Sequence, residues 1–373
     1  MRQLLFLSAL ILMAATKTKA VAQTETIVSP EVHADRTVTF RFNDPSGKFA
    51  KVQIEGLDDV PMTKDSKGIF VATTKPLAPN IYGYNFKADG QTYIDPVNPI
   101  FKPNLLWQGN MMLVPGDPPE NWEIQDVPHG VVHRHFYKSA VIGDQRDYYV
   151  YTPPGYKADA DKRYPVLYLL HGFSDAANAW VEVGKANVIL DNLIAQNKVA
   201  PMLVVMPLGY GVANFASFAG FPKDLVRVKK NYDFFAKGLL KEVIPQVEHD
   251  YRVDPDKEHR ALAGLSMGVA ETLHIGLNNL DQFSYLGSFS AGGLTDKLML
   301  EWPHLNGDEV NSNLKQLFIT CGTADHLIEF HRKLIPWLKS KGIQLTGAET
   351  PGMHEWPVWR RDLITFTQMI FKG

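Results

Sequence analysis

The pattern of apolar and polar residues changes once along the chain. Between residues 31 and 101 the two kinds alternate, and clusters of turn-forming residues such as 43–47 separate the alternating runs. Alternation with a period of two is typical of strands that have one buried face. We therefore predict a small immunoglobulin-like β-sandwich here. Its expected strands include residues 37–42, 52–54, 68–71, 81–86 and 93–98.

From about residue 130, continuous apolar runs alternate with stretches that have helical spacing, among them a helix expected over residues 232–251. This order predicts a mostly parallel sheet with helices on both faces, which is the α/β-hydrolase fold. The expected strands are residues 147–152, 164–170, 201–207, 260–263, 285–289, 317–321 and 344–349.

Proline is concentrated between the two patterns, where the sequence PGDPP occupies residues 115–119. Proline at this density predicts an extended, ordered linker over residues 103–128. We therefore predict the β-sandwich domain over residues 23–102 and the α/β-hydrolase domain over residues 129–373.

The first 22 residues have the features of a signal peptide. An apolar run over residues 4–15 is too short to span a membrane, and the sequence AVA at residues 20–22 provides a small-residue cleavage site. We therefore predict export, to the periplasm or the medium, after cleavage near Ala22. Cys321 is the only cysteine, so the chain has no intramolecular disulfide.

The composition is that of an ordinary soluble globular chain. Of its 373 residues 45% are hydrophobic and 21% are charged, and the formal net charge is −2. This charge gives no electrostatic basis for binding nucleic acid or an anionic membrane surface. The sequence predicts no cofactor, and it leaves the oligomeric state open.

The sequence GLSMG at residues 264–268 follows an apolar run and precedes a helical pattern. A Gly-x-Ser-x-Gly frame in this position is typical of a nucleophile elbow, a sharp turn from strand to helix that exposes a serine hydroxyl. The flanking glycines are needed because a Cβ at either position would collide with a neighbouring element. We predict Ser266 as the nucleophile. The alternative is that Ser266 only caps the helix that follows.

The α/β-hydrolase fold requires an acid and then a histidine after the nucleophile, each in a loop at the carboxyl end of a later strand. Asp325 follows the predicted strand 317–321, and His354 follows the predicted strand 344–349. We predict His354 as general base and then acid, and Asp325 as the carboxylate that orients its imidazole.

Other residues compete for these two roles. Glu355 and Asp296 are the alternative acids, and Asp325 is favoured because it has the clearest strand before it. His326 and His331 also follow Asp325. We expect His326 to lie too close to the acid, and His331 to face solvent from a helix.

The oxyanion hole is expected to come from the backbone N–H groups of Met267 and Phe173. His171 is expected to shape the loop before Phe173 and not to act as a catalyst. His133 and His135 would lie on one face of a strand as a candidate metal pair. No third ligand lies nearby in the sequence, so we predict no metal site.

Five motifs occur in one order: YTPPGY at 151–156, LLHG at 169–172, GLSMG at 264–268, GTAD at 322–325 and PGMHEW at 351–356. Together they resemble the esterase-D type family, which includes the feruloyl and acetyl-xylan esterases of carbohydrate esterase family 1. This resemblance implies hydrolysis of an ester attached to a polysaccharide. The strands before the linker resemble the family-48-type carbohydrate-binding module, which is appended to many glycan-active enzymes.

Aromatic residues are candidate substrate contacts in both domains. Trp180, together with Tyr210 and Phe215 in the Gly- and aromatic-rich segment 208–221, could flank a planar acyl group, or could be core under a cap. In the β-sandwich, Tyr82, Tyr84 and Trp107 could stack on sugar rings, or could be core.

The leading functional hypothesis is a secreted carbohydrate esterase, most of all a feruloyl esterase acting on arabinoxylan. Acetyl-xylan esterase, siderophore-type esterase and acyltransferase on the same fold are the alternatives. A glycan-binding protein with a vestigial catalytic domain is a further alternative, against which the intact Ser266, Asp325 and His354 argue.

Overall fold

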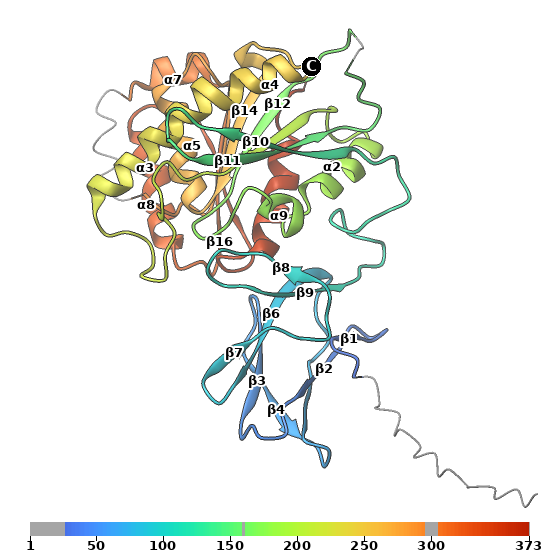
Figure 1. Ribbon diagram of the computed structural model, residues 1–373. Helices are drawn as coiled ribbons and strands as arrows, with labels where there is room; N and C mark the ends of the chain where they lie inside the picture. Colours follow the sequence, from blue (N-terminus) through green and yellow to red (C-terminus); the bar gives the residue numbers. More distant parts are fainter. Residues whose placement is uncertain (1–26, 159–160, 295–304, 373) are drawn as a thin grey trace, which may run out of the picture.

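The computed structural model describes residues 27–158, 161–294 and 305–372. The predicted signal peptide and Asp296 lie outside these residues. The described part forms an antiparallel β domain followed by an α/β-hydrolase domain (Figure 1). No helix within the described ranges has the length and apolar character needed to cross a membrane.

The strands of the β domain are hydrogen-bonded in the order β1-β2-β5-β4-β3-β6-β9-β8, and β7 pairs with β6. Their bounds are β1 Glu31–Val32, β2 Val38–Asn43, β3 Ala50–Ile54, β4 Val60–Lys64, β5 Ile69–Thr73, β6 Asn80–Ala88, β7 Gln91–Tyr93, β8 Phe101–Lys102 and β9 Gly109–Val114.

Alternate side chains of these strands enclose one apolar core, as the alternating pattern predicts. The rings of Phe40 on β2 and Tyr84 on β6 have centroids 4.9 Å apart, although β2 and β6 are not neighbours in the sheet. The sheet therefore folds over itself around the core. Tyr82 and Tyr84 are both buried in this core, which favours their interpretation as core residues over sugar stacking.

The structure differs from the predicted linker over residues 103–128, because β9 lies within that segment and pairs with β6 and β8. Met111, Met112 and Val114 of β9 are buried. Closely spaced prolines on both sides conceal this short apolar run in the sequence. The sheet of the β domain therefore extends to Val114.

The hydrolase sheet has the order β10-β11-β13-β12-β14-β15-β16-β17. Its strands are β10 Val131–Lys138, β11 Gln145–Thr152, β12 Val166–Leu170, β13 Leu203–Pro207, β14 Arg260–Leu265, β15 Tyr285–Phe289, β16 Gln316–Gly322 and β17 Thr346–Thr350. The strands from β12 to β17 run parallel, and β10 and β11 are antiparallel to their neighbours. The predicted fold class is therefore confirmed.

Helices cover both faces of this sheet. Apolar residues of α3, α4, α5, α7 and α8 pack on one face, and those of α1, α2 and α9 pack on the other. The helices are α1 Ala179–Glu182, α2 Ala186–Ala195, α3 Leu225–Gly238, α4 Ile244–Asp250, α5 Met267–Asn278, α7 Gly307–Asn313, α8 Ile328–Ser340 and α9 Trp356–Thr367, with short helical turns η1 Leu239–Val243 and η2 Lys257–His259.

The helix predicted over residues 232–251 begins earlier and is interrupted. It starts at Leu225, where the Asp224 side chain accepts a hydrogen bond from the N–H of Val226, and η1 inserts a π-helical turn between α3 and α4. The cations in residues 225–231 mask the apolar spacing of the first turns.

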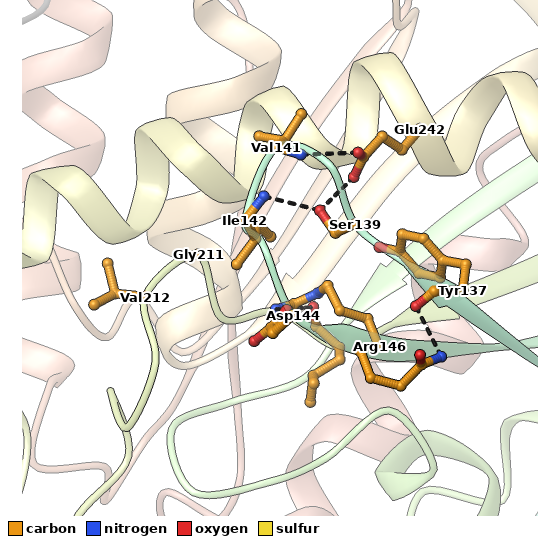
Figure 2. Close-up of polar contacts among 12 residues, drawn as sticks. Tyr137, Ser139, Val141, Ile142, Asp144, Arg146, Gly211, Val212 and Glu242 are labelled. Atoms are coloured by element: carbon orange, nitrogen blue, oxygen red, sulfur yellow. Dashed lines mark hydrogen bonds and ion pairs between the residues drawn. The ribbon is translucent and has the colours of Figure 1, made fainter.

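Glu242 of η1 holds the turn between β10 and β11 against the helix layer. Figure 2 shows its carboxylate accepting hydrogen bonds from the Ser139 hydroxyl and the N–H of Val141, at 2.6 and 3.0 Å. The Ser139 oxygen in turn accepts from the N–H of Ile142 at 2.9 Å. These bonds fix the antiparallel edge of the sheet against η1.

The β domain packs against the hydrolase domain through the end that carries β6, β8 and β9, beside α9 (Figure 1). The buried guanidinium of Arg360 on α9 donates to the side chain of Asn80 and the carbonyl of Ile81, both on β6. It also donates to the carbonyl of Val183 in its own domain. One cation thus connects the two domains through hydrogen bonds.

Candidate active site

Ser266 occupies the tight turn between β14 and α5, as the elbow motif predicts. Its backbone has φ 50° and ψ −117°, a conformation that is strained for a residue with a side chain. The N–H of Ser266 donates to the carbonyl of Phe289 on the neighbouring strand β15 at 3.0 Å, which helps to hold this conformation. The side-chain oxygen of Ser266 accepts no capping hydrogen bond from α5, so it is free for another partner.

The glycines of the motif are required by close approach. A Cβ on Gly264 would lie 2.5 Å from the carbonyl oxygen of Gly268, and a Cβ on Gly268 would lie 2.8 Å from the carbonyl oxygen of His171. Both distances are shorter than real Cβ contacts allow. Only glycine at both positions lets the strand turn directly into the helix.

Ser266, His354 and Asp325 lie in one hydrogen-bonded line. The Ser266 hydroxyl is 2.9 Å from His354 Nε2, and His354 Nδ1 is 2.8 Å from Asp325 Oδ2. The three residues follow β14, β17 and β16, so each lies at the carboxyl end of a parallel strand. With its proton on Nδ1, the imidazole donates to Asp325 and accepts from the serine hydroxyl.

Asp325 is buried and held as a carboxylate. Burial works to raise its pKa, but hydrogen bonds from the His354 ring and the N–H of Leu327 outweigh this effect and keep the pKa below its ordinary value. Burial, together with the charge of Asp325, raises the pKa of the Cys321 thiol to about 12. Cys321 is therefore a neutral thiol beside the carboxylate.

The rival residues are placed differently. Glu355 Oε1 accepts from the N–H of Met353, and its carboxylate faces Gly56 of the β domain and not the imidazole. His326 lies beside Asp325, as expected, with its Nδ1 3.4 Å from Oδ1. The prediction that His331 faces solvent is wrong, because it is 2% exposed within α8. Periodicity alone does not show which face of α8 is covered.

His133 and His135 lie on β10, at the edge of the hydrolase sheet. His135 stacks on Tyr148 with ring centroids 4.8 Å apart and bonds to the hydroxyl of Tyr251. Within the part of the chain that the structure describes, the ligand atoms of Asp325, His326 and His354 lie within 4.8 Å of one another. Both ring nitrogens of His354 already have partners, Asp325 and the serine, so the geometry is that of a hydrogen-bonded line.

The loop after β12 approaches the nucleophile from the other side. A Cβ on Gly172 would lie 3.3 Å from the Cβ of Ser266, so the backbone leading into Phe173 passes next to the serine. Met267 is the first residue of α5, where a helix leaves N–H groups without an intrahelical acceptor. The two N–H groups predicted for an oxyanion hole thus belong to segments that flank Ser266. His171 accepts from the N–H of Gly209 through Nε2, which fits its expected role in shaping the loop.

The aromatic residues named as candidate substrate contacts are buried, which favours their interpretation as core residues. Trp180 is 1% exposed, and its indole N–H donates to the carbonyl of Leu170. Tyr210 and Phe215 are buried in a cluster with Met267 and Phe173. Their rings pack with Met267 and Phe173, which flank Ser266. The glycine-rich sequence around them indicated a loop but not its burial.

Sequence reasoning missed the residues through which the β domain reaches this site. Glu55, directly after β3, accepts from the N–H of Trp356, two residues after His354, at 3.1 Å and forms a 2.8 Å ion pair with Lys102. Asn104 donates to Asp175, two residues after Phe173, at 2.9 Å. Burial raises the pKa of Asp175 to about 7. The sequence around Glu55 and Asn104 has no local pattern that indicates a contact with the other domain.

The fold and the hydrogen-bonded line define this protein as an α/β-hydrolase in which a serine, a histidine and an aspartate are linked by hydrogen bonds. In agreement, residues 139–314 match the family model described as "Putative esterase". The chain is 30% identical over 350 residues to an endo-1,4-beta-xylanase/feruloyl esterase from Xylanibacter ruminicola, covering 92% of this chain and 46% of that protein. The chain thus spans less than half the length of this curated relative.

Solved structures agree on the fold. A CE1 ferulic acid esterase from Anaeromyces mucronatus superposes with a TM-score of 0.57 at 24% identity, over 68% of this chain and 95% of that one. The enterobactin esterase of Shigella flexneri gives a TM-score of 0.65 at 18% identity, over 89% and 93% of the two chains. The chain is thus similar in sequence to a xylanase/feruloyl esterase, and it shares the α/β-hydrolase fold of both solved esterases.

Proposed function

We propose that this protein is a serine esterase that releases ferulate from feruloylated arabinoxylan. The hydrogen-bonded line from Asp325 through His354 to Ser266 carries the proposal, because it is the arrangement that activates a serine hydroxyl for acyl transfer. The choice of ferulate is supported by the 30% identity to a xylanase/feruloyl esterase, a similarity that covers both domains of this chain.

The geometry supports a two-step reaction. His354 Nε2 takes the proton of Ser266 as Oγ attacks the ester carbonyl, and Asp325 stabilises the imidazolium that forms. The negative charge on the carbonyl oxygen is bound by the N–H groups of Met267 and Phe173. His354 then protonates the leaving sugar oxygen, which departs and leaves ferulate on Ser266. Water, deprotonated by the same imidazole, attacks this acyl-enzyme, and His354 returns the proton to Ser266 Oγ as the acid leaves.

The test is acid release from methyl ferulate, 4-nitrophenyl acetate and feruloylated arabinoxylan by the wild type and Ser266→Ala. We expect ferulate from the wild type and a loss of at least about 10⁴-fold in the variant. Ser312→Ala, in an exposed serine of α7, is the matched control and should keep full activity. Equal activity of Ser266→Ala and the wild type would overturn the proposal.

Other substrate patterns would assign a different activity. Acetate release without ferulate release would identify a deacetylase. A siderophore-type esterase is the second candidate, favoured by the enterobactin esterase likeness, which extends over 89% of the chain and so includes both domains. It would hydrolyse a catecholate ester and leave ferulate esters intact. Ferulate appearing on an added sugar, and not as free acid, would identify an acyltransferase.

We also propose that the enzyme is exported, because arabinoxylan is a polymer outside the cell and the first 22 residues have the pattern of a signal peptide. Cell fractionation of the expressed full chain, with N-terminal sequencing of the product, tests cleavage near Ala22.

A further inference from the structure

Trp107 is an exposed aromatic residue at the junction of the two domains. It follows β8 in the β domain and is 57% exposed. Its ring centroid is 6.4 Å from that of Phe173, which belongs to the loop beside Ser266. The β domain thus places one large aromatic surface next to the candidate oxyanion loop of the hydrolase domain.

Hydrogen bonds fix the segment that carries this indole. The Asn104 side-chain oxygen accepts from the N–H groups of Leu106 and Trp107, at 3.0 and 2.9 Å. The amide of Asn104 donates to Asp175, and the N–H of Leu105 donates to the carbonyl of Ser174 at 2.8 Å. The two acceptors, Ser174 and Asp175, are the next two residues after Phe173 in the chain. Trp107 and the oxyanion loop are therefore held as one unit, and little conformational entropy is lost when a ligand binds.

An exposed tryptophan held in one position is suited to stacking on a flat, partly apolar ligand face. In an ester substrate two groups could supply that face, the aromatic acyl group and the sugar of the leaving alcohol. Trp107 is more than half exposed, whereas ligand pockets bury most of the group they enclose. The polysaccharide is the part of the substrate that continues into solvent. The position of Trp107 therefore favours the sugar.

We propose that Trp107 forms a sugar-binding subsite of the active centre, which stacks on the pentose of the leaving group next to Phe173. This inference rests on the proposed ester hydrolysis. In this arrangement the β domain contributes directly to substrate binding at Ser266, in place of binding glycan at a distant surface.

The experiment compares two ferulate esters that differ only in the alcohol. A feruloylated arabinoxylan oligosaccharide carries the sugar, and methyl ferulate does not. For Trp107→Ala we expect kcat/KM on the oligosaccharide to fall about 10-fold, mainly through KM, and kcat/KM on methyl ferulate to stay within about twofold of the wild type. Trp107→Phe, which keeps a smaller ring, should lie between Trp107→Ala and the wild type on the oligosaccharide.

Phe49→Ala is the matched control. Phe49 is an aromatic residue of the same domain that is 76% exposed, and it lies next to the end of β3 that is farther from Glu55. Its loss should leave both activities unchanged. An equal loss on both esters in Trp107→Ala would overturn the subsite, because it would mean that the indole acts on the loop or on the acyl group. Unchanged activity on both would overturn it as well. A wild type inactive on both esters would instead overturn the proposed function, and the subsite with it.

Discussion

Asp325 and Glu355 are both carboxylates close to His354, but only Asp325 contacts the imidazole. We expect Asp325→Asn to lower kcat by about 10⁴-fold, because the amide favours the wrong ring tautomer and no longer stabilises the imidazolium. Glu355→Gln should lower kcat by less than about 10-fold. Steady-state kinetics on methyl ferulate measure both. A larger loss for Glu355→Gln than for Asp325→Asn would reverse the assignment of the acid.

Glu271 on α5 is a buried carboxyl without a hydrogen-bond partner among the described residues. Burial raises its pKa well above the ordinary 4.5, and the attraction of Arg146 offsets this only in part. The folded state therefore keeps the proton to a higher pH than the unfolded chain does. The contribution of this group to stability is complete below its ordinary pKa and declines as the pH rises above it.

We expect Glu271→Gln to remove this pH dependence. Between about pH 5 and about pH 8, the free energy of unfolding should decrease less in the variant than in the wild type. Urea denaturation at a series of pH values measures the difference. Glu309→Gln, at an exposed residue of α7, is the control and should follow the wild-type curve. A Glu271→Gln curve parallel to the wild type would show that the carboxyl is already ionised in the folded protein.

At the residue scale, the sequence predicts the positions that depend on local pattern. Ser266 is identified by its glycine frame, and Asp325 and His354 by the ends of apolar strands, so the structure finds all three together. For Trp180 and Phe215 the sequence leaves two interpretations open, because an aromatic residue has the same sequence pattern whether it lines a pocket or is buried in the core.

At the scale of elements, α9 begins two residues after His354, and its first N–H group is bound by a side chain of the other domain. Glu55 accepts from the N–H of Trp356, the first residue of α9, where a negative charge also interacts favourably with the helix dipole. Burial works to raise the pKa of Glu55, but Lys102 and the N–H of Trp356 outweigh it and keep the pKa below its usual value. Glu55 is thus a charged anchor for the loop that holds the imidazole.

We expect Glu55→Gln to act on catalysis through the position of His354. A weakened cap of about 1 kcal/mol corresponds to at most about a fivefold loss in rate, and the loss should be in kcat with KM on methyl ferulate unchanged. Glu31→Gln, at a carboxylate paired with Arg41 in β2 of the same domain, should leave kcat unchanged. If Glu55→Gln lowers only the melting temperature and not kcat, the contact is structural and does not position the histidine.

The sequence predicts the buried parallel strands more accurately than the short strand β9, because only the former have a local apolar pattern. The buried parallel strands are continuous apolar runs, so β12, β13, β14 and β16 appear in the sequence close to their observed bounds. β9 is short and lies among prolines, and it becomes a strand only because β6 and β8 offer it hydrogen-bonding partners. Pairing over such a distance in the sequence leaves no local pattern.

At the scale of the whole molecule, the sequence predicts two domains. It does not predict that side chains of the β domain contact the loops that flank Ser266. The contacts between them are made by single polar side chains such as Arg360, whose partners lie about 280 residues away in the chain. Burial lowers the pKa of Arg360 to about 10, so the group still carries its charge at neutral pH. Replacing this buried cation while its partners remain should lower the free energy of unfolding, because the partners are then buried and unpaired.

We expect Arg360→Met to separate the unfolding of the two domains. The change leaves Asn80 and the carbonyls of Ile81 and Val183 without their donor, which should lower the free energy of unfolding by about 3 kcal/mol. The indole of Trp122 lies 5.9 Å from the guanidinium, so tryptophan fluorescence is sensitive to this interface, whereas far-ultraviolet circular dichroism follows the helices. In urea the two transitions should coincide for the wild type and separate for the variant.

Arg332→Met is the control, because Arg332 forms only exposed ion pairs with Glu329 and Glu349, which contribute at most about 1 kcal/mol. If Arg360→Met is no less stable than Arg332→Met, the buried arginine does not hold the domains together. Coincident transitions in a destabilised Arg360→Met would mean that the contacts of Glu55 and Asn104 are sufficient to couple them. Separate transitions would show that the junction next to Ser266 depends on one buried side chain of α9.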